Sequence, residues 1–223
     1  MKPRTILSDA DLRRVEEAIR EAEARTRGEI VVAVTRASGD YPGAAWTGAC
    51  LAGLGALLLL VAAHTVTNVW GLGSPMWALL SAAGGAAVGY LVVGSSPALT
   101  RLLFPDEVMA RQVDLAARAA FVDHEVFNTR DRSGVLVFVS LLEHRVEVLG
   151  DSGIEAHVEP GEWDRIVDGI VRGVREGHAG DAMVEAVRHC GEILDRRGLE
   201  RRADDRDELS NRIRIDRGEG EEG

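Results

Sequence analysis

Apolar residues near the start of the chain recur at intervals of three and four, which predicts an amphipathic helix over about residues 8–26. The residues that form this stripe are Leu12, Val15, Ile19 and Ala22. Ser8, followed three residues later by Asp11, is placed to cap the helix. The run EIVVAVT at 29–35 is continuous and rich in valine, so we expect a buried strand there.

The same two patterns return after residue 105. Residues 106–127 predict a second helix, whose apolar face we assign to Leu115, Ala119, Val122 and Val126. The run GVLVFVSLL at 134–142 is the strongest strand signal in the chain, and 146–149 is expected to pair with it as an antiparallel neighbour.

Two further helices are expected beyond this pair of strands. Pro160 is placed to open the first of them. Gly177 and Gly180 separate it from the second, which extends to about residue 195. The charged segment 198–223 has few large apolar residues, so we expect a disordered acidic tail.

Between the two halves of this pattern, charged residues disappear. No Asp, Glu, Lys or Arg occurs from residue 41 to residue 100. Two apolar runs lie in this stretch, one from Ala44 to Val66 and one from Met76 to Pro97, and each is long enough to cross a hydrocarbon core of ~30 Å. A chain of 223 residues is too short to enclose two such helices, so we predict a transmembrane hairpin over 44–97.

The hairpin has two further features of membrane helices. Gly85 and Gly89 have the GxxxG spacing that lets helices approach closely in lipid. Packing of the two spans on each other accounts for this spacing, and a homodimer formed through the same face is the alternative. The connecting loop has no Lys or Arg, whereas Arg36 and Arg101 flank the outer ends. The positive-inside rule therefore places the soluble domain and both termini in the cytoplasm.

Residues 8–36 cannot bury their apolar faces alone, so we expect them to fold with residues 106–195. The predicted fold class is α/β: a small central sheet sandwiched by helices and interrupted by the two-helix transmembrane hairpin. A net charge of −10 argues against a nucleic-acid partner, because phosphate binding needs a basic surface. Cys50 and Cys190 form no C-x-x-C pair, so a zinc or redox site has no support.

Asp151 is the candidate for metal chemistry. It follows a predicted strand, and α/β proteins place ligand groups at strand ends. With Ser152 it would bind Ca²⁺ or Mg²⁺, and Glu29 is the nearest candidate for a second carboxylate. The alternative is that Asp and Gly simply form the turn. No cofactor follows with certainty from the sequence, and no catalytic residue is identified.

The segments TRGEIVVAV and TRDRSGVLVFVSLLEHRVEVLGDSGIEAHVEPGEW together resemble the TPM domain family. The resemblance covers roughly 8–36 and 106–195 and is most specific over 129–154. The inserted spans resemble a bacterial, membrane-bound branch of this family. The resemblance implies an α/β sandwich and work at membranes, often in maintaining membrane protein complexes. For plant members of the family, phosphatase activity and divalent-cation binding have been proposed.

Two functions follow as expectations. The first is a module anchored in the bacterial plasma membrane that interacts with, or maintains, membrane protein complexes without chemistry of its own. Its partners would be the bilayer and a membrane protein that the sequence does not name. The alternative is a divalent-metal-dependent, phosphatase-like hydrolase that uses Asp151. A channel is a distant third, because two spans offer no polar pathway.

Overall fold

The computed structural model describes residues 7–67, 74–155, 158–196, 209–210 and 212–216. The chain divides into two compact units. One contains Met1–Gly39 together with Ala110–Gly223, and the other contains Asp40–Met109.

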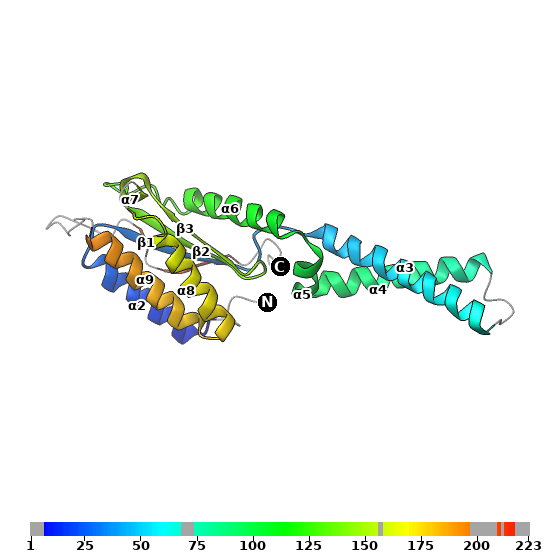
Figure 1. Ribbon diagram of the computed structural model, residues 1–223. Helices are drawn as coiled ribbons and strands as arrows, with labels where there is room; N and C mark the ends of the chain where they lie inside the picture. The colour runs from blue at the N-terminus through cyan, green and yellow to red at the C-terminus, as the bar shows by residue number, and fades with distance from the viewer. Residues whose placement is uncertain (1–6, 68–73, 156–157, 197–208, 211, 217–223) are drawn as a thin grey trace, which may run out of the picture. The chain divides into compact units, whose positions relative to one another are not determined.

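The first unit is built on a four-stranded sheet in the order β3-β2-β1-β4 (Figure 1). Its strands are β1 (Glu29–Thr35), β2 (Gly134–Ser140), β3 (Arg145–Gly150) and β4 (Arg214–Asp216). Strand β1 pairs in parallel with both β2 and β4, and β3 pairs antiparallel with β2. The segment before the predicted hairpin is therefore paired with the segment after it. The predicted antiparallel pair is confirmed, and so is the predicted fold class.

Helices cover both faces of this sheet, as Figure 1 shows. On one face lie α2 (Asp9–Glu23), α8 (Glu162–Glu176) and α9 (Ala179–Arg196), and on the other lies α6 (Asp106–Asp123). Alternate side chains of β1 point to opposite faces of the sheet. Ile30, Val32 and Val34 join the core under α2 and α9, while Val31 and Ala33 join the core under α6. Burial on both faces explains why β1 and β2 have continuous apolar runs.

Helix α2 begins as the sequence predicts. Asp11 N–H donates to Ser8 Oγ at 3.1 Å, and Ser8 N–H donates back to the Asp11 carboxylate at 3.0 Å. The two bonds form a capping box.

Close packing requires a glycine at position 28. A Cβ atom there would lie 2.6 Å from a methyl group of Leu194, so glycine lets the start of β1 pass close to α9.

The predicted apolar face of the second helix is wrong for Leu115, Ala119 and Val122, whereas Val126 is buried as predicted but lies beyond the end of α6. Leu115 and Val122 are 55% and 59% exposed, whereas Val113 and Ala117 are fully buried against the sheet. Helix α6 contains many alanines, so its side chains give a weak apolar pattern. The prediction followed the larger residues, but the face with small residues packs closely on β1 and β2.

Three boundaries also differ from the prediction. Pro160 lies just outside α8, which starts at Glu162 after Gly161, a glycine with φ of 82°. Gly180 is inside α9, where it packs closely against Asp11 of α2. The predicted disordered tail is wrong at Arg214–Asp216, because these residues add β4 to the edge of the sheet. The tail residues 198–208, 211 and 217–223 lie outside the described residues.

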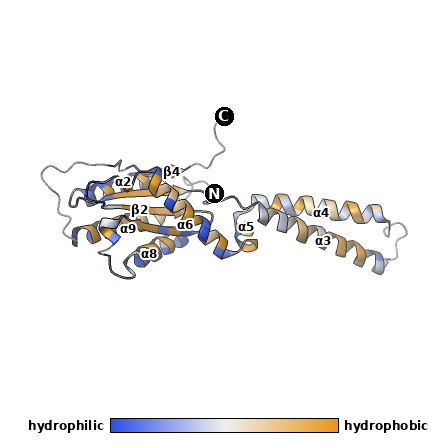
Figure 2. Cartoon of the chain, turned by 90° about the horizontal axis from the view of Figure 1, so that it is seen from above, coloured by the Kyte–Doolittle hydropathy of each residue, from blue (hydrophilic) through white to orange (hydrophobic). Residues whose placement is uncertain are grey.

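The second unit contains two long helices, α3 (Pro42–Thr67) and α4 (Pro75–Ser95), followed by the short α5 (Pro97–Leu103). Figure 2 shows that α3 and α4 are apolar along most of their length. Both begin slightly before the predicted spans, and Pro97 opens α5 instead of ending α4.

Gly85 and Gly89 are used inside this hairpin. A Cβ atom at Gly85 would lie 2.6 Å from the carbonyl oxygen of Ala52, and one at Gly89 would collide with the carbonyl oxygen of Gly48. The GxxxG spacing therefore serves the packing of α3 on α4. The homodimer through the same glycines stays a prediction. The remaining described element, α7 (Ser152–Glu155), is a single turn after β3.

The assignment of the α6 faces can be tested with a matched pair of truncations. Val113→Ala should lower the free energy of unfolding by roughly 2 kcal/mol, because it removes two buried methyl groups and leaves a cavity. Leu115→Ala should change it by less than about 0.5 kcal/mol, since Leu115 is exposed. Denaturant unfolding of the purified full chain measures both. An equal loss in the two variants would contradict the observed orientation of α6.

Candidate functional site

Asp151, the predicted metal ligand, lies at the end of β3 and is 4% exposed. Its Oδ1 accepts hydrogen bonds from the Arg132 guanidinium at 2.9 Å and from the Ser152 N–H at 2.7 Å. Arg132 Nε also lies 2.7 Å from Oδ2, so one guanidinium faces both carboxylate oxygens. The Asp151 N–H donates to the carbonyl oxygen of Gly134 at 2.8 Å and ties the end of β3 to β2.

Glu29 is buried at the same end of the sheet, but on another strand. It lies opposite Gly134 in the β1–β2 register, whereas Asp151 bonds to Gly134 from the β3 side. Adjacent strands are about 4.8 Å apart, so the backbones of Glu29 and Asp151 are separated by roughly 10 Å. The structure therefore makes Asp151 and Ser152 neighbours and places β2 between them and Glu29.

The groups around Asp151 do not make a fitting donor set for Ca²⁺ or Mg²⁺. Calcium takes six to eight oxygen ligands. Among the described residues, no group of three or more His, Cys, Asp or Glu side chains lies close enough to hold a metal ion. Arg132 already supplies positive charge to the carboxylate, which favours an ion pair at this position. Metal binding by Asp151, Ser152 and Glu29 stays a prediction.

A second polar cluster lies at the opposite edge of the sheet, where β1 and β2 end. Glu143 is 6% exposed, and its carboxylate accepts a hydrogen bond from the Ser38 N–H at 2.9 Å and another from the Ser140 hydroxyl. The Ser38 hydroxyl in turn donates to Ser140 Oγ at 2.7 Å. The cluster joins the segment that follows β1 to the hairpin between β2 and β3.

The sequence interpretation missed this cluster. Glu143 lies in the short segment between the two predicted strands, for which no role was expected. A signal was present, because Ser140 ends a strongly apolar strand and a buried polar group needs a partner. The partner could be found only after β1 and β2 were known to be parallel, since Ser38 lies more than a hundred residues away.

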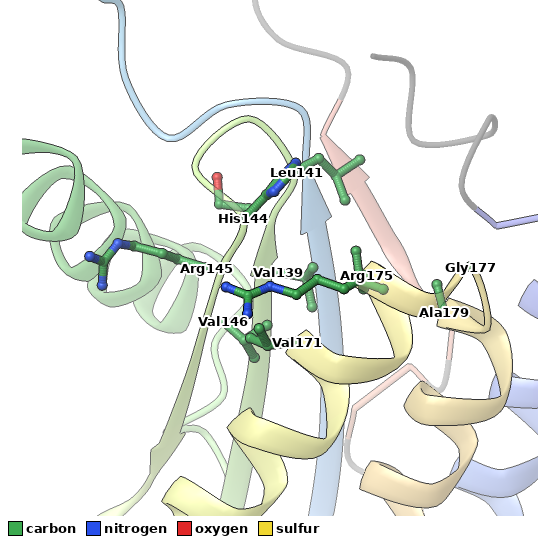
Figure 3. A pocket seen from close by; sticks show the side chains of 11 residues that line it. Val139, Leu141, His144, Arg145, Val146, Val171, Arg175, Gly177 and Ala179 are labelled. Atoms are coloured by element: carbon green, nitrogen blue, oxygen red, sulfur yellow. The ribbon is translucent and has the colours of Figure 1, made fainter. Parts of the chain in front are cut away.

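A cavity of about 440 Å³ adjoins the carboxyl edge of the sheet, which is the end at which β1 and β2 finish. Its walls are the end of β2, the β2–β3 hairpin and the start of β3 on one side, and the end of α8 and start of α9 on the other (Figure 3). The volume falls within the range of small-molecule sites, roughly 300–1,000 Å³. Ligands of α/β proteins bind outside the carboxyl ends of parallel strands, so this edge is the candidate ligand site.

The Glu143 cluster predicts a measurable contribution to stability. Glu143→Ala should lower the free energy of unfolding by roughly 1–3 kcal/mol, because it leaves the Ser38 N–H and the Ser140 hydroxyl without their acceptor. Glu185→Ala, which removes an exposed carboxylate of α9, is the control and should have little effect. The comparison uses thermal or denaturant unfolding of the full chain. Equal effects of the two substitutions would rule out the proposed role of the cluster.

The ion pair of Asp151 gives a test against the metal hypothesis. Asp151→Asn should destabilise the protein by about 1–2 kcal/mol, since the guanidinium of Arg132 loses its charged acceptor. If the ion pair is the role of this carboxylate, the loss should be the same in EDTA and in millimolar Ca²⁺ or Mg²⁺. Metal-dependent stabilisation of the wild type that is absent in the variant would instead establish a metal site.

Comparison with known proteins agrees with this architecture. The BA42 protein of the psychrophilic bacterium Bizionia argentinensis, whose structure was determined by NMR, matches over 94% of this chain and 95% of that chain with a TM-score of 0.57. The sequence identity is 19%, so this likeness shows a shared fold alone. No curated protein matches the chain. Residues 106–193 match the family model of the TPM domain. The resemblance seen in the sequence is confirmed over residues 106–193, which are similar to the TPM domain.

Proposed function

We propose that the chain is a TPM domain anchored in the bacterial plasma membrane by α3 and α4, where it interacts with other membrane proteins. The main support for this anchor is the exposed apolar surface of the two helices. Leu58, Leu59 and Leu79 are 60%, 74% and 72% exposed. A soluble protein rarely exposes a continuous apolar surface of this extent, whereas a lipid environment buries it.

The dimensions of the helices support this anchor. At 1.5 Å per residue, the 26 residues of α3 extend over about 39 Å and the 21 residues of α4 over about 32 Å. Both exceed the ~30 Å of a hydrocarbon core. Within an 18-residue apolar stretch of each helix, only 11% is buried. Two core helices of a soluble protein would be mostly buried, so this exposure favours the membrane.

Three aromatic residues in the described part of the hairpin lie near its two ends. Trp46, near the start of α3, packs edge to face against Tyr90, near the end of α4, with ring centroids 5.2 Å apart. Trp77 lies at the loop end, in the first turn of α4, and is 52% exposed. Tryptophan and tyrosine concentrate at the two membrane–water interfaces, so this arrangement suits a hairpin that spans the bilayer once in each direction.

The interaction role rests on the resemblance to the TPM family and on the way the domain is attached. Strand β1 is followed within a few residues by α3, so the membrane anchor is part of the domain's own sheet connection. A domain attached in this way stays at the membrane surface, where membrane proteins are its available partners. Arg36 and Arg101 flank the outer ends of the hairpin, which favours a cytoplasmic domain.

The two native cysteines allow a labelling test. Cys50 is exposed on α3, and Cys190 is buried in α9, where burial raises the pKa of its thiol to about 12. In intact membranes a water-soluble maleimide should therefore label neither residue, because lipid covers the first and the protein core covers the second. In a soluble protein Cys50 would react readily.

Two added cysteines would then report the topology. Ser74→Cys, at the loop end of α4, should react from outside intact cells. Asp168→Cys, on α8 of the soluble domain, should react only after the cells are opened. Rapid labelling of Cys50 in intact membranes would refute the anchor, and the reverse accessibility of the two added cysteines would refute the orientation.

A further inference from the structure

We propose that the cavity at the carboxyl edge of the sheet binds a small amphipathic carboxylate, with the carboxylate at Arg175 and the apolar part between α8 and β3. This inference concerns the folded domain alone. It therefore goes beyond the proposed membrane anchoring, and the two can fail separately.

The cavity has an apolar interior. Val139 and Val146 contribute buried side chains from β2 and β3, and Val171 and Val174 contribute half-buried side chains from α8. A preformed hollow lined by valines favours an alkyl or aromatic group, because burial of apolar surface contributes about 25 cal/mol per Å². A volume of about 440 Å³ accommodates a ligand of that kind and excludes a folded partner.

The charge at the cavity is opposite to the charge of the chain. The whole protein carries a formal net charge of −10. The 11 residues that line the cavity, in contrast, include two arginines and one histidine and no Asp or Glu. An anion that approaches this protein therefore meets repulsion over most of the surface and attraction at this cavity. Charge complementarity thus selects an anionic head group for an otherwise apolar ligand.

Of the two arginines, Arg175 is the one placed to bind the ligand. Figure 3 shows its side chain extended from the last turn of α8 toward β3, where Val146 lies. Among the described residues, no carboxylate lies within ion-pair distance of Arg175. A guanidinium presents two parallel N–H donors to a carboxylate, which gives the pair both strength and orientation.

Arg145 points the other way. Figure 3 shows its guanidinium directed away from Arg175 and toward α6. The same direction follows from Glu147, two residues further along β3. Burial and Asp114 of α6 raise the pKa of Glu147 above its ordinary value, and Arg145 and Arg118 partly oppose this shift. Arg145 therefore serves the α6 face of the sheet, and Arg175 is left as the guanidinium over the cavity.

Hexanoate is a suitable probe, because it joins a carboxylate to a short alkyl chain and dissolves in water. The full chain, reconstituted in nanodiscs of neutral lipid with ¹³C-labelled valine methyl groups, would be titrated with hexanoate and with neutral hexanamide. Saturable shifts confined to a few valine methyl signals should appear with hexanoate. Hexanamide should bind at least about tenfold more weakly, since it lacks the charge that Arg175 recognises.

Three variants make the test specific. Arg175→Gln should raise the dissociation constant for hexanoate at least about tenfold. Arg172→Gln removes an exposed arginine that lies one turn before Arg175 and does not line the cavity, so it should leave the dissociation constant unchanged. Val171→Phe should abolish binding by filling the hollow, and an otherwise preserved methyl spectrum would show that this variant is folded.

The proposal is overturned if hexanoate produces no saturable shifts in the wild type. Equal affinities for hexanoate and hexanamide would also overturn it, as would equal losses in the Arg175 and Arg172 variants. Equal affinities would make the cavity an apolar hollow that does not select an anion, and equal losses would show that Arg175 is not the group that binds the carboxylate.

Discussion

The parallel pairing of β1 with β2 is the interaction on which the rest of this protein depends. Seven residues of each strand are in register, from Glu29 opposite Gly134 to Thr35 opposite Ser140. This pairing joins the two parts of the domain across the inserted hairpin and places α2 and α9 on a common core. It also brings Ser38, which follows β1, beside Ser140 at the end of β2. Glu143 and Asp151 lie at opposite ends of the sheet because β3 runs between them, antiparallel to β2.

The sequence was sufficient for the elements whose signals are local. The valine-rich run of β1, the apolar run of β2 and the capping box of α2 each depend on neighbouring residues only, and each was predicted near its observed bounds. The two apolar spans were also clear, because no polar pattern competes with them. The TPM resemblance came from the same local segments that form β1, β2, β3 and the turn at Asp151.

Features that depend on distant contacts could not be predicted in the same way. The buried face of α6 is set by small alanines that pack closely on the sheet, and an amphipathic pattern gives more weight to Leu115 and Val122. Strand β4 has only three residues and forms because the edge of β1 is available to it. The cavity requires residues 139–146 and 171–179 to face each other, and no short motif records that arrangement. For Asp151 the sequence indicated a carboxylate at the end of a strand but could not show that Arg132 pairs with it.

The hairpin returns the chain to the place where it left. Tyr41, before α3, and Phe104, after α5, lie at the two ends of the inserted unit, and their rings are in contact at a centroid distance of 4.8 Å. A flexible insertion between β1 and β2 would impose an entropy of loop closure that grows with its length. A hairpin that forms first brings its two ends together, so the later pairing of β1 with β2 resembles the closure of a short loop. The membrane anchor that we propose would thus shorten the search by which the two parts of the domain find each other and complete the sheet.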